Sequence, residues 1–468
     1  MIRRYQQRTI YEEITKHLLP DHSGLIWEEW LVKVDRLLAD EALIEIVHAA
    51  LAQRHPESQS RGRHSTPSEV ILRLLVLKQL KNWTYATLER EVRANLIYRE
   101  FTRIGVEKVP DEKTMIRLAQ ALGTETIVKI HERVVELGRE EKVVKGRKLR
   151  VDTTVVETNI HYPLDSQLLA DGVRVITRTV RKLEQAVGQA GQQFRDRMRS
   201  VKYRLIELGK AARQQGEQAK EKREQIYRKL MATTNKVVAE AEQVVQAVVT
   251  GAKTATTKQG QALAEKLTGK VKTMSDLTRR VLAQTKARVV DQNTHYKDKL
   301  LSIFEVETEA IRKGKAAKPT EFGKIVKIQE AENQIIVAYE VYDQRPADSE
   351  LLLPAVEKHK QVFGHAPALV AADAAFFSAE NETKAKEAGV KQVAIPSKAT
   401  KSSARKAMQK ERWFRRAQRW RVGCEGRISV LKRRHGLFRS RYQGSAGMQR
   451  WVGFGVIANN LISIARAP

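Results

Sequence analysis

Three carboxylates lie in apolar or strongly basic surroundings, where an acidic side chain is unexpected unless it has a chemical role. Asp152 lies within the apolar, β-branched run KLRVDTTVV, Asp373 ends the short apolar run ALVAAD, and Glu425 lies in the most basic segment of the chain. An unpaired carboxylate inside an apolar strand is costly unless it binds a metal ion or another cation. A lone Asp after a strand can instead cap a loop, and a lone Glu among arginines can form an ion pair. The combination Asp, Asp, Glu predicts a site for divalent metal ions, because such ions prefer hard oxygen ligands.

Basic and aromatic side chains surround Glu425 in the run RWRVGCEGRISVLKRR. On a helix, Arg421 lies one turn before Glu425 and Lys432 two turns after it, on roughly the same face. Arginine and lysine bind phosphate well, and indole rings among arginines are suited to stacking on splayed bases. A solvated basic face, and core packing of at least one tryptophan, are the alternatives. The candidate DNA-binding residues are Trp413, Trp420, Arg421, Lys432, Arg433 and Arg434.

The positive charge of the chain is concentrated in two segments. The 468 residues include 85 Lys+Arg and 55 Asp+Glu, a net charge of +30. Residues 174–300 hold 28 basic and 12 acidic residues, a net of +16, and residues 398–441 hold 16 and 2, a net of +14. Two basic segments on an otherwise balanced chain predict a polyanionic partner, and nucleic acid is the first candidate. Basic helices that only keep the chain in solution are the alternative.

Composition excludes several classes of protein. Hydrophobic residues make up 42% of the chain, which is enough for folded cores. The single cysteine, Cys424, excludes an internal disulfide framework and a Cys-rich zinc site, and we expect it to serve packing. No apolar run reaches the ~18–20 residues of a membrane span, and the first residues lack the apolar core of a signal peptide. We therefore expect a soluble, intracellular protein with no membrane partner.

The first 145 residues have helical patterns. Short helices joined by tight turns resemble a helix-turn-helix DNA-binding unit, and three-helix packing without a DNA role is the alternative. Tyr85, Leu88 and Val92 share one helical face. The expected features are a loop at Gln59–His64, a capping box at Thr66–Glu69, a helix Val70–Leu80, a new helix after Asn82–Thr84, and a helix from Asp111 to Leu122 that Gly123 ends.

Strand patterns follow, and a long helical segment interrupts them. No proline occurs between Leu164 and Lys318, and valines recur there at helical spacing, which predicts an all-helical insertion with turns at Gly251 and Gly260. Strands before and after it predict an α/β domain. The predicted strands are Lys148–Val156, Leu301–Glu307, Lys324–Ile328, Gln334–Tyr342, Ala368–Ala372 and Gln392–Ile395, with a turn at Glu332–Gln334 and a helix at Ser349–Val362.

A tempting Ser-His-Asp combination does not qualify as a hydrolase triad. His161, Asp165 and Ser166 lie within six residues of one another, which does not by itself create triad geometry, and no GxSxG elbow accompanies them. We expect Asp165 to cap the helix that follows.

Several phrases of the chain resemble the DDE transposases of bacterial insertion sequences, in particular the ISNCY-type group. The resemblance covers about two thirds of the chain, including the helical region 60–140. It implies an RNase H-like catalytic core and a triad of Asp152, Asp373 and Glu425. The phrases are VDTTVVETNIHYPLDS (151–166), LLADGVRVITR (168–178), KPTEFGKIVKIQEAENQIIVAYEVYD (318–343), VAADAAFFSAEN (370–381) and CEGRISVLKRRHGLFRSRY (424–442).

Related transposases carry a Tyr-x2-Arg-x3-Glu-x6-Lys signature. Arg421, Glu425 and Lys432 fit its last three positions, whereas Gln418 stands at the Tyr position. The resemblance implies two Mg²⁺ ions, replaceable by Mn²⁺, with Asp152 bridging both ions, Asp373 on one and Glu425 on the other. Such ions, about 3.5–4 Å apart, activate water or a DNA 3′-OH for attack on phosphorus and stabilise the leaving oxygen.

The resemblance implies a transposase that binds terminal inverted repeats and catalyses Mg²⁺-dependent strand cleavage and strand transfer on double-stranded terminal and target DNA. A homodimer is expected in the DNA complex, because two element ends must be held together, and a bacterial cytoplasmic, nucleoid-associated location is expected. A related RNase H-like nuclease and a domesticated, non-catalytic DNA-binding regulator are the alternatives. The expected domains are an N-terminal helical segment (1–58), a helix-turn-helix-like domain (59–145), a catalytic domain with a mixed sheet (146–165 and 299–455), the helical insertion (166–298) and a C-terminal segment (456–468).

Overall fold

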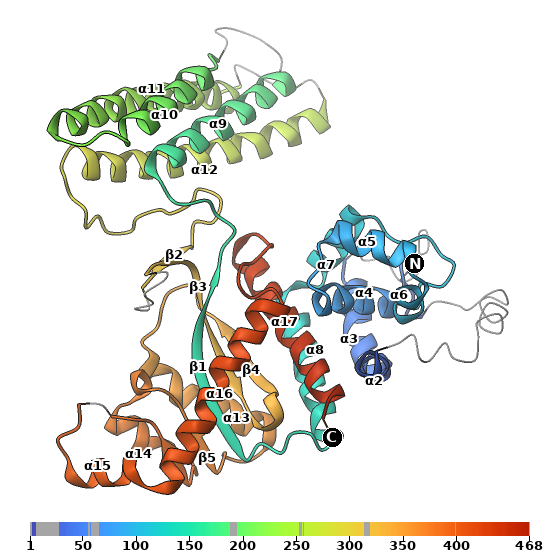
Figure 1. Cartoon of the computed structure of the whole chain (residues 1–468). Coiled ribbons are helices and arrows are strands. Elements are labelled where there is room, and N and C mark those ends of the chain that lie inside the picture. The colour runs from blue at the N-terminus through green and yellow to red at the C-terminus, as the bar shows by residue number, and fades with distance from the viewer. Residues whose placement is uncertain are drawn as a thin grey trace. The chain divides into compact units, whose positions relative to one another are not determined.

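The computed structural model divides the chain into two compact units. Unit 1 comprises residues 1–159 and 311–468, and unit 2 comprises residues 160–310 (Figure 1). The structure describes residues 2–5, 28–54, 57, 65–187, 194–251, 255, 257–312, 319–397 and 399–467. The predicted loop at Gln59–His64, and most of the N-terminal helical pattern before residue 28, lie outside these residues. Among the described helices, none combines the length and the apolar character that a membrane crossing requires.

Seven helices form the first part of unit 1 in the described ranges, and polar caps explain where several begin. Thr84 Oγ1 accepts a hydrogen bond from the Thr87 amide, and Asp111 Oδ1 accepts one from the Thr114 amide. Both helix starts agree with the sequence patterns. The helices are α2 (Glu29–Leu37), α3 (Glu41–Ala52), α4 (Ser68–Leu80), α5 (Tyr85–Ala94), α6 (Leu96–Phe101), α7 (Glu112–Ala121) and α8 (Gly123–Glu140).

The capping box predicted at Thr66–Glu69 is wrong. The amides of Ser68 and Glu69 donate to the backbone carbonyls of residues 3 and 4. The Glu69 carboxylate instead accepts a 2.9 Å bond from Arg73, whose fully buried guanidinium also lies 2.6 Å from Asp35. A buried guanidinium requires counter-charges, so the carboxylate serves Arg73 rather than the helix terminus.

A six-stranded mixed sheet forms the second part of unit 1. β1 pairs antiparallel with β3 and parallel with β5, β3 pairs antiparallel with β4, and β5 pairs parallel with β6. The short strand β2 continues the sheet beyond β3. The strands are β1 (Lys148–Glu157), β2 (Glu309–Ile311), β3 (Glu321–Glu330), β4 (Ile336–Val341), β5 (Leu369–Ala371) and β6 (Gln392–Ala394).

Five of the six predicted strands agree with the structure in place and type, and so does the predicted helix, which is α13 (Leu352–Phe363) after a short 3₁₀ turn. The strand predicted at Leu301–Glu307 is wrong, because this segment consists of bends and turns. The amide side chain of Gln284 bonds both the N–H and the C=O of Leu300. Apolar side chains at the start of the segment therefore join the core of unit 2 without a strand partner.

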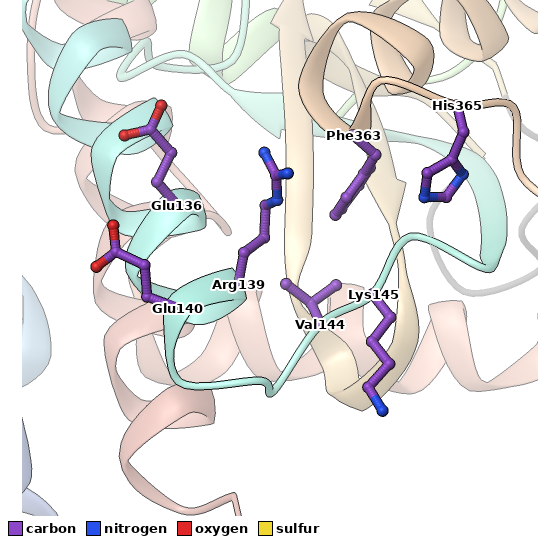
Figure 2. A pocket seen from close by; sticks show the side chains of 7 residues that line it. All are labelled: Glu136, Arg139, Glu140, Val144, Lys145, Phe363 and His365. Atoms are coloured by element: carbon purple, nitrogen blue, oxygen red, sulfur yellow. The ribbon is translucent and has the colours of Figure 1, made fainter.

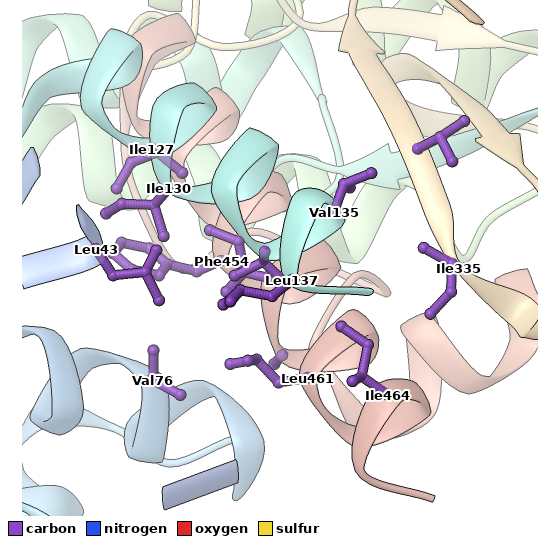
Figure 3. Packing of buried hydrophobic residues seen from close by; sticks show 14 of the residues in the cluster. Leu43, Val76, Ile127, Ile130, Val135, Leu137, Ile335, Phe454, Leu461 and Ile464 are labelled. Carbon is purple, nitrogen blue, oxygen red and sulfur yellow. The ribbon is translucent and has the colours of Figure 1, made fainter. Parts of the chain in front are cut away.

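The C-terminal helix α17 (Gly444–Ala465) joins the N-terminal helices to the sheet. It contacts α2, α4, α8 and β4, and it is buried on all sides from Trp451 to Leu461. Figure 3 shows its side chains Phe454, Leu461 and Ile464 among those of α3, α4 and α8. A helix that is apolar all round belongs inside a core. The domain boundary predicted after residue 455 falls inside this helix.

Unit 2 consists of long helices that pack on one another. Its helices are α9 (Asp165–Val187), α10 (Met198–Ala211), α11 (Glu217–Val249) and α12 (Lys258–Val289). Gly251 has φ +77° just after α11, as expected of a turn, whereas Gly260 lies within the first turn of α12, where its amide is capped by Thr257. The turn predicted at Gly260 is therefore wrong.

Asp165 does not act as the predicted helix cap. Its buried carboxylate lies 2.7 Å from Arg288 Nε and accepts a 2.9 Å hydrogen bond from Gln284, and both partners come from α12. Asp165 therefore ties the start of α9 to the end of α12.

Candidate active site

Asp152 and Asp373 extend from neighbouring parallel strands in the same register. Arg150 of β1 pairs with Ala371, the last residue of β5. Counting two residues onward on each chain brings Asp152 level with Asp373. The side chain of Asp152 is 14% exposed, and its Oδ1 accepts the amide of Thr153 at 2.7 Å. Asp152 thus lies on β1 two residues past the Arg150–Ala371 pair, and Asp373 lies two residues past the end of β5.

Asp373 also caps the turn that follows β5. Its Oδ1 accepts a 2.8 Å hydrogen bond from the amide of Ala375, at the start of the 3₁₀ turn Ala374–Phe376. The loop-cap interpretation and the site interpretation are thus compatible, because this bond uses one of the two carboxylate oxygens.

The long helix α16 (Arg412–Arg434) carries Glu425 and packs on β1, β5 and β6 (Figure 1). Phe414 and Ala417 pack on Ala371 and Ala394 of the two parallel strands. The amide side chain of Gln418 donates to the carbonyl of Ala372, next to Asp373, at 3.3 Å and to that of Ala394. The residue at the tyrosine position of the transposase signature therefore fastens this helix to the strand ends.

Arg150 fastens the same helix to the centre of the sheet. Its guanidinium donates to the carbonyl of Trp420 and pairs with the buried carboxylate of Glu330. A Cβ atom on Gly423 would come within 2.5 Å of this guanidinium, so any larger side chain there would have to displace the guanidinium from its contacts with Trp420 and Glu330. Next to it, burial and the nearby Glu330 and Asp152 carboxylates raise the pKa of the Cys424 thiol well above its usual range. The thiol is fully buried, which agrees with the packing role expected for it.

Arg421 links two of the three predicted acids. Its Nη1 lies 4.0 Å from Asp152 Oδ2, and its Nη2 donates to Glu425 Oε1 at 3.1 Å. The Arg421 side chain is 15% exposed, whereas that of Glu425 is 60% exposed. The structure thus brings Glu425 to the Asp152 side of the sheet through a cation that both carboxylates share.

The chemistry of the three carboxylates suits divalent metal ions, but their positions do not yet form a closed site. Within the described ranges, no three His, Cys, Asp or Glu side chains are grouped so as to hold a metal ion. The Arg421 guanidinium shows that the space between Asp152 and Glu425 attracts positive charge. The donor set consists of oxygens alone, as Mg²⁺ and Mn²⁺ prefer.

The other predicted contact residues have different surroundings. Lys432 lies 3.7 Å from Glu321 at the start of β3, and Arg433 and Arg434 are exposed at the end of α16. The Trp420 ring lies 4.8 Å from the Arg150 guanidinium, and Trp413 packs edge-on against Phe414 at 5.5 Å. Packing contacts therefore explain both half-buried indoles without DNA.

Sequence reasoning missed Arg150 and Gly423, and it identified Gln418 only as a departure from the transposase signature. Arg150 stands two residues before Asp152 in a strand, so both side chains project to the same face. That alternation is a signal that the sequence offers. The contacts of Gln418 and Gly423 depend on the packing of α16 on the sheet, and no spacing rule reveals them.

The hollows of the surface do not mark the predicted acids. An open pocket of about 590 Å³ lies where α8 and the end of α13 meet, and none of the predicted site residues lines it. Figure 2 shows its lining side chains, which are Glu136, Arg139, Glu140, Val144, Lys145, Phe363 and His365. A second hollow of about 730 Å³ follows α16 and is lined by Arg412, Arg415, Gln418, Arg419 and Val422.

Comparison with protein families finds transposases at both ends of the chain. Residues 14–121 match the family described as a transposase domain (DUF772), and residues 380–465 match the family described as a transposase DDE domain. Glu425 lies within the second match, whereas Asp152 and Asp373 lie outside both. No curated protein and no solved structure matches the chain. These two matches support a DDE transposase of an insertion sequence, and the matched DDE domain implies an enzyme that cleaves DNA and transfers its strands.

Proposed function

We propose that the protein binds the terminal inverted repeats of its element, and cuts and joins DNA at a two-metal site formed by Asp152, Asp373 and Glu425. One observation carries this assignment. The β1–β5 register, which pairs Arg150 with Ala371, supports Asp152 and Asp373 lying near one level, and Arg421 of α16 contacts both Asp152 and Glu425. Three acids that are far apart in sequence thus belong to one region of unit 1.

The sheet supports an RNase H-like core. In chain order, β1, β3 and β4 are antiparallel neighbours, and β5 and β6 then add parallel strands on the other side of β1. The first aspartate lies on the central strand and the second follows the adjacent one. The sheet thus holds the first aspartate within its central strand, and the second just after the end of the neighbouring parallel strand.

The three acids and Arg421 would have different roles in the reaction. Asp152 and Asp373 are held by strands, whereas Glu425 is exposed on a helix, so Glu425 is free to turn from Arg421 toward bound ions. When bound, the metal ions activate the attacking oxygen and stabilise the leaving one. Arg421, once released from the two carboxylates, is placed to contact a phosphate next to the bond that is cut.

Basic side chains along α16 support DNA binding beside these acids. The hollow along this helix is lined by Arg412, Arg415 and Arg419, and its lining also includes Gln418, which contacts the carbonyl before Asp373. Phosphate contacts by arginine fix the register of a duplex without reading its sequence. The helices of the first family match, including α5 and α7, are then the candidates for recognising the repeats, with three-helix packing as their alternative role.

The test uses labelled terminal-repeat DNA and the full-length protein. With Mg²⁺ or Mn²⁺ we expect cleavage at the element end and products joined to a second DNA, and with EDTA neither. Ca²⁺ should support binding but little cleavage, because its looser coordination misplaces the attacking oxygen.

The same assay separates the alternatives. Cleavage without joined products would identify a nuclease, and binding without cleavage would identify a regulator. Cleavage that persists in EDTA would overturn the metal assignment. Mass measurement of the DNA complex tests the homodimer, since two protein chains and two ends are expected in the joining complex.

A further inference from the structure

Unit 2 has a folded core of its own and lies outside both family matches, which end at residue 121 and resume at 380. Apolar side chains of α9, α11 and α12 form one buried cluster. Close packing of two helices shows at Gly172, where a Cβ atom would lie 2.4 Å from Thr278 Oγ1. Apolar packing therefore holds the helices together, and charged side chains that form no ion pair within the unit are available to bind a partner.

The acidic side chains of unit 2 are largely used inside the unit. Ion pairs between different elements tie Arg197 to Glu240, Arg279 to Glu242 and Arg288 to Asp165, at 2.5 Å, 2.5 Å and 2.7 Å. Such pairs neutralise the arginines that take part. The remaining lysines and arginines carry the excess charge of this segment.

That excess is concentrated on α12. Its 32 residues include eight basic and two acidic side chains, Glu265 and Asp276, whereas the 33 residues of α11 include six basic and five acidic ones. Two of the eight, Arg279 and Arg288, are ion-paired. For the other six the described part of the chain shows no ion pair, and all six are exposed. They are Lys258, Lys266, Lys270, Lys272, Arg280 and Lys286.

Three of these cations share one face. At 3.6 residues per turn, Lys266, Lys270 and Arg280 lie within an arc of about 80°. Gly269 and Thr273 lie between them, and space is open around the Gly269 Cα. From Lys266 to Arg280 the helix rises about 21 Å, a length over which duplex DNA presents about twelve phosphates. The two acids of α12 lie at or beyond the edge of this arc.

We propose that this face of α12 binds the sugar–phosphate backbone of duplex DNA. The proposal rests on the proposed function only for the identity of the polyanion. Backbone contacts by lysine and arginine raise affinity for any sequence, because each releases counterions from the DNA. The neutral residues between the cations let the backbone approach the helix. Unit 2 thus supplies DNA affinity that neither family-matched segment provides.

The experiment compares two triple variants of the full-length protein. In the α12 variant, Lys266, Lys270 and Arg280 are each replaced by Gln. In the control variant, Lys222, Lys229 and Lys236 of α11 are each replaced by Gln. These control lysines are also exposed, repeat every seven residues on one face, and remove the same total charge, but their helix is almost balanced.

Binding is measured by fluorescence anisotropy on a 30-base-pair duplex without terminal repeats, in EDTA, from low to high salt. We expect the α12 variant to lose a slope of about 2.7 in log K against log salt, since each lost contact removes roughly 0.9. Its affinity near 0.1 M salt should fall by roughly two orders of magnitude. The control variant should change the slope by less than about 1.

Equal losses of DNA affinity in both variants would show that the total charge of the protein governs binding, rather than this face of α12. Unchanged affinity in the α12 variant would show that this face is only a solvated surface. A loss that is as large on single-stranded DNA or on RNA as on duplex DNA would also overturn the proposal. Circular dichroism and thermal unfolding confirm that each variant is folded. Because no metal is present and no strand is cut, failure of the proposed catalytic site would leave this result unaffected.

Discussion

Arg421 holds the two carboxylates of Asp152 and Glu425, because its guanidinium is a counter-charge for both. Metal ions and this guanidinium therefore compete for the same two carboxylates. Two like-charged carboxylates near each other repel unless a cation lies between them. The side chain is thus expected to act in two ways, as a stand-in cation before metal binding and as a phosphate contact afterwards.

Replacing Arg421 by Ala should strengthen metal binding and weaken cleavage. We expect Mn²⁺ affinity, measured by electron paramagnetic resonance, to rise roughly tenfold, a change of ~1.4 kcal/mol, because the competing cation is gone. DNA cleavage should fall, because the phosphate contact is lost. Arg421→Lys retains the charge and should lie between the two proteins in both assays. Unchanged Mn²⁺ affinity in Arg421→Ala would contradict the competition.

Lys78 is a buried cation that the site does not use. It is 2% exposed, and its ammonium faces the rings of Tyr85, Tyr442 and Trp451 at 4.8, 5.2 and 4.8 Å. Burial, with a smaller contribution from Arg441, lowers the pKa of Lys78 to about 7. The unfolded chain keeps the ordinary pKa of about 10.4.

The free energy of unfolding should therefore rise with pH between about 7 and 10.4, because the unfolded state binds the proton that the folded state has lost. The Lys78 contribution is at most about 1.4 kcal/mol per pH unit. Urea denaturation at pH 7.0 and 9.5 should show a larger gain for the natural protein than for Lys78→Met. Equal gains in both proteins would show that Lys78 keeps its proton when folded.

At the scale of elements, the position of α16 decides whether the acids can act together. Gly423 lies against the Arg150 guanidinium, whereas a Cβ atom on Gly426 of the same helix would meet nothing within 4 Å. Two glycines three residues apart thus allow a controlled comparison. A side chain at Gly423 would meet the Arg150 guanidinium, whereas a side chain at Gly426 would meet open space.

Gly423→Ala should shift α16 from the sheet, lower the stability of the protein by about 1–3 kcal/mol and reduce cleavage. Gly426→Ala should be neutral or stabilising by about 0.5–1 kcal/mol, since alanine favours a helix over glycine. Thermal unfolding and the cleavage assay provide the comparison. If both substitutions behaved alike, the contact between Arg150 and α16 would not govern the site.

The elements also show where prediction from the sequence reaches its limit. β-branched runs located β1, β3 and β4, and helical spacing without proline located the helices of unit 2, because both patterns report local periodicity. The segment after Lys299 has a strand-like pattern but forms no strand, because the Leu300 amide bonds the side chain of Gln284 on α12 and not another strand. Asp152, Asp373 and Glu425 were identifiable by contrast with their surroundings. The contacts of Gln418 and Gly423, by contrast, join segments that are distant in the sequence, so the sequence does not reveal them.

At the scale of the whole molecule, the two ends of the chain belong to one unit. Helices of the first family match and strand β4, which precedes the second, contact α17, which is buried on all sides from Trp451 to Leu461. The periodicity of the sequence predicts that such a helix is buried, but it does not predict which elements pack against it. The sequence analysis therefore assigned the N-terminal helices and the C-terminal segment to separate domains. Between them the chain inserts unit 2, with its own core and its own charge.

The central claim is that Asp152, Asp373 and Glu425 form one catalytic metal site, and cleavage of terminal-repeat DNA tests it most directly. Asp152→Asn, Asp373→Asn and Glu425→Gln should each lower Mg²⁺-dependent cleavage by roughly 10²-fold or more, because metal coordination needs the negative charge. DNA binding should remain, since phosphate contacts elsewhere supply most of the affinity. The exposed Glu380→Gln serves as a control with unchanged cleavage. Full cleavage by any one of the three variants would remove that residue from the site and contradict the account.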